Sequence, residues 1–428
     1  MISDSSAFRA LQSRNYRLFV AGQLVSLIGT WMQSVAQSWL IYRLTGSAAL
    51  LGLIGFAGQI PIFVLAPLGG VVADRLNRHR VLVATQSAMM VLAFALAALT
   101  LGGIVQEWHI FVLATLLGIA NAFDIPTRQA FLAETVKRED IVNAIALNSS
   151  MLNGARIVGP GIAGLVVAAF GEGWCFLLNA LSYVAVIGAL LVMHIDPPPH
   201  PSAHVSAWDS IVEGFAYSWN TKPVRALLLL LGLISVMGMP YSVLMPVIAA
   251  SVLRGGPNAY GLLLSASGVG ALAGATLLMF RRHVRGLGRW VAVSAVSFGI
   301  SLIAFSFSRA LWLSSLLLVP AGFFMMVEMA ASNTLIQSMI PNRLRGRVMS
   351  VYSMMFMGMA PVGALLAGAL AAPLGAARTV ALGGAICVAG GVLFGVGLPS
   401  LRGPARELIL AQQLAAGSPA EEVTPLQE

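Results

Sequence analysis

Long apolar stretches recur along this chain, and they constrain its fold more than any other feature. Each run of about 20 residues or more is long enough to cross a bilayer as a helix. We place six runs in each half, at 16–43, 47–73, 80–103, 109–134, 140–169 and 174–195, and at 224–253, 258–281, 288–308, 310–339, 345–372 and 376–399. Only 10% of the residues are charged, against about a quarter in soluble domains. The sequence predicts an all-α membrane protein.

The two halves repeat one another at a constant offset. Glycines 118, 154, 159, 164 and 171 correspond to glycines 322, 358, 363, 368 and 375, always 204 residues later, and Asp124 corresponds to Glu328. Such periodicity indicates two copies of one unit, and many transporters form a site where paired halves meet. We expect six-helix bundles at 1–195 and 224–400, a cytoplasmic linker at 196–223 and a disordered cytoplasmic tail at 401–428.

Positive charge gathers in alternate loops. The larger set is Arg9, Arg14, Arg17, Arg75, Arg78, Arg80, Lys137, Arg138, Lys222, Arg225, Arg281, Arg282, Arg285, Arg289, Arg343, Arg345, Arg347, Arg402 and Arg406, and the opposite loops hold Arg43, Arg254, Arg309 and Arg378. Cytoplasmic loops carry this excess, so we expect a multi-pass protein of a bacterial inner membrane with both termini cytoplasmic. The dispersed charges exclude a basic face for nucleic acid.

A helix is expected within the linker. Trp208, Ile211, Phe215 and Trp219 recur at helical spacing between residues 207 and 220. This helix would either lie on the inner membrane surface or serve as a plain connector.

A motif of glycine, aspartate and arginine follows the second span. Its residues are Gly70, Asp74, Arg75, Arg78 and Arg80. We expect Gly70 to allow close helix approach, Asp74 to pair with the arginines, and Asn77 to occupy a left-handed turn position, which asparagine tolerates. The alternative is a basic loop that only fixes orientation.

The fifth span carries small residues around a proline, Ala155, Gly159, Pro160, Ala163 and Gly164. Helix packing alone would account for them. However, this pattern resembles the antiporter motif of the major facilitator superfamily, and the loop motif resembles the signature that this superfamily carries between its second and third helices. The segments 15–19 and 121–130 resemble its enterobactin-exporter-like, transmembrane secretion effector branch. The resemblance implies a fold of two six-helix bundles, a cytoplasmic latch at the loop motif and an export function.

Four ionisable residues lie inside predicted spans, and we take them as candidates for gating or proton coupling. Asp124 and Arg128 are four residues apart on one helical face, and the distance of Arg156 from the intervening loop predicts a similar depth for it on the next span. An unpaired charge in the membrane costs several kcal/mol, so we expect Asp124 to pair with Arg128, Arg156 or both. Glu328 has no basic residue at helical spacing, and burial then favours its protonated form. The alternative is a permanently protonated acid.

Further polar residues predict the wall of a central cavity. They are Gln23, Ser26, Thr30, Gln33 and Gln37 on one face of the first span, Asn121 on the fourth, and Ser149 and Asn153 on the fifth. Lipid would reject such a face, although bonds between helices are an alternative.

Together these features predict a secondary transporter rather than an enzyme. The hypothesis is a monomeric, proton-coupled exporter of a siderophore-like or drug-like small molecule that works by alternating access. It needs a lipid bilayer and a proton gradient, and we expect no cofactor, no metal and no ATP-binding loop. The alternatives are a multidrug efflux antiporter of broad specificity and a non-transporting sensor or assembly partner. An enzyme would need converging catalytic groups, which the dispersed histidines do not suggest.

Overall fold

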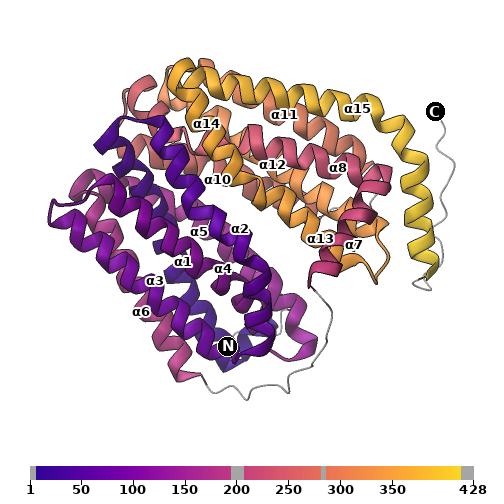
Figure 1. The fold of residues 1–428 in the computed structure, drawn as a ribbon, viewed down its shortest axis with the longest axis horizontal. Coiled ribbons are helices and arrows are strands. Elements are labelled where there is room, and N and C mark those ends of the chain that lie inside the picture. Colours follow the sequence, from indigo (N-terminus) through magenta and orange to yellow (C-terminus); the bar gives the residue numbers. More distant parts are fainter. Residues whose placement is uncertain (1–5, 194–206, 281–285, 416–428) are drawn as a thin grey trace.

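The computed structural model describes residues 6–193, 207–280 and 286–415. This part of the chain holds twelve helices that are long and apolar enough to cross a membrane, which confirms the predicted fold class. They form two bundles, one from each half of the sequence (Figure 1). The spans of the first half are α1 (Arg14–Thr45), α2 (Ala48–Arg75), α3 (Arg78–Leu101), α4 (Glu107–Leu132), α5 (Ile141–Phe170) and α6 (Glu172–Val192).

Two spans of the second half are interrupted. The seventh begins as α8 (Lys222–Leu233) and passes through a π-helical turn, a 3-10 turn and α9 (Met245–Val247) before ending at Val252. Pro240 and Pro246 lie within this span, where a proline removes a backbone donor and breaks the helix. The eleventh span runs from α13 (Arg345–Ser353) through a π-helical turn into α14 (Ala360–Leu374). The regular spans are α10 (Pro257–Met279), α11 (Leu287–Phe307), α12 (Leu311–Met339) and α15 (Ala376–Ala415).

The structure contradicts part of the predicted disordered tail, and it contains the helix that was predicted within the linker. Helix α15 extends to Ala415, so residues 401–415 are helical rather than disordered. Residues 416–428 and the proline-rich stretch at 194–206 lie outside the described residues. The helix predicted within the linker is present as α7 (Ala207–Asn220).

Glycine marks the same turn in both halves. Gly171 connects α5 to α6 and its repeat counterpart Gly375 connects α14 to α15, with φ angles of 89° and 83°. Residues with a side chain rarely adopt this conformation. The shared backbone geometry explains why both copies have glycine here.

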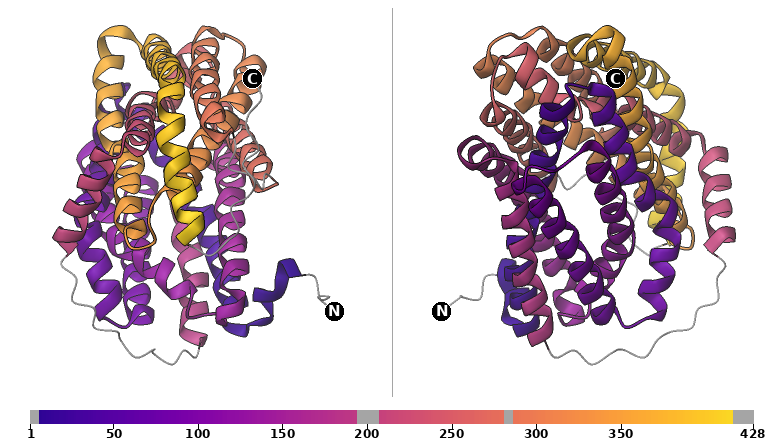
Figure 2. Two further views of the ribbon diagram at one scale, coloured as in Figure 1. Left: turned by 90° about the vertical axis from the view of Figure 1, so that its right-hand side faces the viewer. Right: turned by 60° about the vertical axis from the view of Figure 1, so that its left-hand side comes forward.

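Within the described ranges, the two halves pack together from the middle of the molecule to one end. We call the end bearing Arg78 and Arg347 the basic end, and the other, which bears Gly171 and Gly375, the opposite end. A Cβ atom on Gly164 of α5 would lie 2.9 Å from the carbonyl oxygen of Pro257 in α10, and one on Gly368 of α14 would lie 2.9 Å from the Cα of Gly52 in α2. Both contacts lie toward the opposite end, and the bundles diverge toward the end where α7 lies (Figure 1, Figure 2).

Helix α7 is held against α13 at the basic end. Glu213 pairs with Arg343 at 3.3 Å and with Arg347. The hydroxyl of Tyr217 donates to the carbonyl oxygen of Met339 at 3.4 Å. A Cβ atom on Gly214 would lie 2.6 Å from the carbonyl oxygen of Arg347. The linker helix is therefore part of the second bundle.

The segment before α1 makes equivalent contacts in the first bundle. Offset by 204 residues, Ser13 corresponds to Tyr217. The Ser13 hydroxyl donates to the carbonyl oxygen of Thr135, the counterpart of Met339, at 2.7 Å. Ala10 corresponds to Gly214, and its amide donates to the Asn143 side chain, the counterpart of Arg347, at 3.0 Å. The internal repeat thus begins before the first membrane span of each half.

Candidate functional site

Polar side chains are accessible along the inner parts of several spans from both halves. Thr30 and Ser34 of α1, Ser149 of α5 and Ser353 of α13 are exposed, and Asn153 of α5, Asn121 of α4 and Asn333 and Gln337 of α12 are half-buried. Lipid offers such groups no hydrogen-bond partner. Because the halves diverge at the basic end, we infer that these residues line a polar cleft that opens there.

The polar face predicted for α1 is divided between two environments. Gln23, Ser26 and Gln33 are buried, and the Gln33 side chain accepts a hydrogen bond from Asn179 of α6 at 2.6 Å. The prediction that these three residues line a cavity is wrong for this conformation, because all three are buried. Thr30 is exposed and Gln37 is half-buried.

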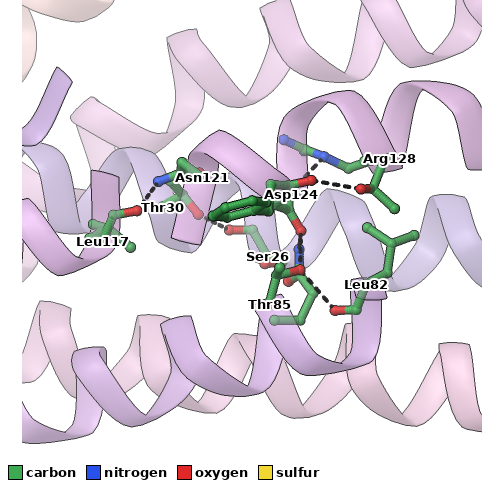
Figure 3. Close-up of polar contacts among 11 residues, drawn as sticks. Ser26, Thr30, Leu82, Thr85, Leu117, Asn121, Asp124 and Arg128 are labelled. Atoms are coloured by element: carbon green, nitrogen blue, oxygen red, sulfur yellow. Dashed lines mark hydrogen bonds and ion pairs between the residues drawn. The ribbon is translucent and has the colours of Figure 1, made fainter. Parts of the chain in front are cut away.

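Asp124 lies in a buried network between α3 and α4. Its carboxylate accepts hydrogen bonds from Thr85 at 2.9 Å and from Gln86 at 2.8 Å, and it pairs with Arg128 Nε at 3.2 Å. Figure 3 shows Thr85 and Arg128 at Asp124. The pair with Arg128 matches the prediction, whereas Thr85 and Gln86 were missed. Their only sequence signal is polarity within an apolar span.

Arg156 does not pair with Asp124. It lies 15 residues into α5 from the basic end, whereas Asp124 lies eight residues from the end of α4, so at about 1.5 Å per residue it is roughly 10 Å deeper. The similar depth predicted from loop counting was wrong. The Arg156 guanidinium instead lies over the ring of Trp31 in α1, 5.8 Å from its centroid.

Glu328 is as deeply buried as Asp124 but has a simpler environment. Its carboxylate accepts a hydrogen bond from Ser332 one turn later, at 3.0 Å. Within the described ranges no lysine or arginine pairs with it. Equivalent positions in the two halves thus hold one paired and one isolated acid.

Arg78 is the centre of the loop motif at the basic end. It pairs with Asp74 at 3.7 Å and with Glu134, just beyond α4, at 2.6 Å, and its Nε donates to the carbonyl oxygen of Ala73 at 2.8 Å. Arg75 and Arg80 are exposed. Glu134 was missed because its proximity depends on the packing of α2 against α4.

Two details of this motif differ from the prediction. No atom outside the helix lies within 4 Å of a Cβ built on Gly70, whereas Gly69 packs directly against Ala122 of α4. Asn77 has a φ of −64° rather than a left-handed conformation, and its side chain caps α3 by accepting from the Arg80 amide. Capping satisfies a free helix donor, which explains asparagine here.

The small residues of α5 serve two interfaces. A Cβ on Gly159 would lie 2.5 Å from the Trp31 Cβ, whereas Gly164 and the Pro160 carbonyl pack against Gly261 of α10. Ala155 and Ala163 are fully buried. The pattern therefore fixes α1 and the second half against α5.

Comparisons with known proteins agree with this architecture. The transmembrane secretion effector family profile matches residues 5–411. A staphyloferrin A transporter of Staphylococcus aureus is 25% identical, covering 87% of this chain and 94% of its own. The multidrug efflux pump Tap of Mycolicibacterium fortuitum is 29% identical, covering 83% and 88%.

Solved structures share the fold at low identity. The nucleoside transporter NupG superposes with a TM-score of 0.71 at 15% identity, over 90% of this chain and 98% of its own. A D-xylose-proton symporter superposes with a TM-score of 0.67 at 14% identity, over 89% and 96%. The family match over nearly the whole chain, with twelve membrane helices, means that this protein belongs to the transmembrane secretion effector family of major facilitator superfamily transporters.

Proposed function

We propose that this transporter is a proton-coupled exporter of a small organic molecule in a bacterial inner membrane. It alternates access between two bundles, with both termini and the basic end in the cytoplasm, as the excess of arginine there favours. Its relatives support export, since they include multidrug and macrolide efflux proteins and a siderophore transporter.

The observation that carries proton coupling is the isolation of Glu328. A buried carboxylate without a cation is costly, so the group holds a proton in the conformation described here. Movement of the bundles would change its surroundings and allow the proton to leave. Asp124 is held by Arg128 and two hydrogen bonds and is better suited to a structural role.

Alternating access is supported by the distribution of contacts between the halves. The glycine contacts of Gly164 with α10 and of Gly368 with α2 close the opposite end, while polar residues are accessible toward the basic end. In the alternate state the glycine contacts would separate and the two basic ends would approach each other. The Asp74, Arg78 and Glu134 cluster ties α2 and the start of α3 to the end of α4 and would keep the first bundle intact as a rigid unit.

Flux into proteoliposomes tests this proposal. The full chain is reconstituted with an imposed pH gradient, and a radiolabelled macrolide and staphyloferrin A serve as probes. We expect the gradient to drive accumulation of at least one probe, and Glu328→Gln to abolish it while counterflow remains. Glu107→Gln, an exposed acid at the start of α4, is the control.

Three results would separate the alternatives. Undiminished gradient-driven flux in Glu328→Gln would remove this residue from the mechanism. Transport of both probes would favour a multidrug pump of broad specificity. Absence of flux and counterflow for both probes would favour the non-transporting sensor or assembly partner.

A further inference from the structure

The membrane interior of the first half holds more positive than negative charge. Asp124 neutralises Arg128 at 3.2 Å, which leaves Arg156. In the described part of the chain, no carboxylate forms an ion pair with Arg156 within 4 Å. A guanidinium at this depth is costly without an anion, and its cation–π contact with Trp31 supplies only part of the compensation.

Arg156 lies at the inner limit of the polar cleft. The next residue, Ile157, accepts a hydrogen bond from Ser265 of α10 at 2.8 Å, so the halves join immediately beyond it. Toward the basic end, Asn153 is half-buried and Ser149 is exposed. Arg156 is itself half-buried, so a molecule that enters the cleft from the basic end can reach its guanidinium.

The packing around Trp31 orients this guanidinium. Gly159 has no side chain where a Cβ would lie 2.5 Å from the Trp31 Cβ, and this space lets α1 approach α5. The indole then lies beneath Arg156. The planar guanidinium carries N–H donors that match the two oxygens of a carboxylate.

The burial of the acids inside the described spans argues against binding of a cation at Arg156. The acids in the interior of the spans, Asp124 and Glu328, are each 1% exposed. A cationic molecule would therefore find no accessible carboxylate near Arg156. A phosphate carries about −1.5 to −2 charges at neutral pH, more than one guanidinium neutralises, whereas a carboxylate carries one.

We propose that Arg156 and Trp31 form an anion subsite of the transport cleft, which binds the carboxylate of an organic acid. The guanidinium binds the carboxylate edge-on, and the indole provides an apolar surface for the adjoining part of the molecule. This inference rests on the proposed function for its cleft, but it concerns binding and is tested without flux.

Three probes that differ in charge test the subsite. They are 1-naphthaleneacetate, its neutral amide 1-naphthaleneacetamide, and the cationic 1-naphthylethylamine, titrated calorimetrically into the detergent-purified full chain. A hydrogen-bonded ion pair is worth more than a neutral bond, so we expect the acid to bind about tenfold tighter than the amide and the amine to bind most weakly.

Variants assign this preference to the subsite. Arg156→Gln should bind acid and amide equally, and Arg156→Lys should keep part of the preference because it retains charge without the planar fork. Arg378→Gln, an exposed arginine at the opposite end, should behave as the wild type. Thermal unfolding of each variant verifies that it is folded.

The wild-type comparison keeps the inference testable even if a variant does not fold. The subsite is contradicted if the acid binds no better than the amide, whether all three probes bind equally or none binds. It is also contradicted if a folded Arg156→Gln keeps the full preference. Proton-driven flux of a macrolide would survive either result, so failure of the subsite is distinct from failure of the exporter.

Discussion

Asp124 and Glu328 show how the same repeat position can serve two chemical roles. Asp124 has an arginine and two hydrogen-bond donors from its neighbours, whereas Glu328 has one serine hydroxyl. Of the two acids, only Asp124 has a cation within ion-pairing distance in the described part of the chain. The difference comes from the neighbouring side chains, since burial is the same at both positions.

The Asp124–Arg128 pair makes a quantitative prediction. Arg128→Gln leaves a buried carboxylate without its cation, and breaking such a pair costs about 3–5 kcal/mol. We expect a value near the lower limit, because Thr85 and Gln86 still donate to Asp124. Asp124→Asn combined with Arg128→Gln removes both charges and should recover much of the stability in a double-mutant cycle. Equal thermal midpoints for the single and double variants would contradict the argument.

At this scale the sequence predicted interactions within one helix better than those between helices. The Asp124–Arg128 pair follows from a spacing of four residues. The position of Trp31 beneath Arg156 depends on how closely α1 approaches α5, and the bond from Thr85 depends on the rotation of α3. Neither quantity can be read from spacing.

At the scale of elements, α7 and the segment before α1 are equivalent clasps on their bundles. Glu213 of α7 pairs with Arg343 and Arg347, and its repeat counterpart Arg9 pairs with Asp140 at 3.4 Å. The charges are reversed between the halves, and Asp140 corresponds to Leu344, the residue next to Arg343, so each ion pair reaches the same turn. A clasp at this place braces the turn that joins two spans.

The α7 clasp predicts an effect of charge reversal. Glu213→Lys places a cation beside two arginines, and we expect it to lower stability by about 1 kcal/mol at low salt, because partly exposed pairs contribute little more. High salt should reduce the effect. Combining it with Arg347→Glu should restore the thermal midpoint. A loss that does not change with salt would mean that α7 is held by packing instead.

Element boundaries were largely predictable, whereas departures from regular helix were only partly so. The apolar runs located every span because the membrane requires about 20 such residues. Pro240 and Pro246 account for the broken seventh span. The π-helical turn at Met354–Gly358 has no proline within it. The docking of α7 was not predicted, since it depends on Gly214 and Tyr217 meeting a surface formed by a later span.

For the whole molecule, the distribution of contacts predicts which compartment reaches the cleft. Both native cysteines are buried, so a cysteine introduced at Asn153 reports on the cleft with little background. We expect Asn153→Cys to react with a charged maleimide from the cytoplasmic side of inside-out vesicles. Reaction from the other side alone would contradict the proposed orientation.

The glycine contacts between the halves at the opposite end should determine how strongly this conformation is populated. A Cβ on Gly164 already lies 2.9 Å from the Pro257 oxygen and 3.3 Å from Gly261, so Gly164→Leu cannot pack against α10 unless the opposite end separates. The bundles would then favour the state closed at the basic end, and labelling of Asn153→Cys from the cytoplasmic side should fall several-fold. Gly188→Leu is the matched control, because no atom outside its helix lies within 4 Å of a Cβ built on Gly188. A ligand can shift such an equilibrium only by its differential affinity for the two states. If Gly164→Leu leaves the labelling rate unchanged, closure of the opposite end and opening of the cleft are not coupled, and rigid rocking of the two halves is the wrong description.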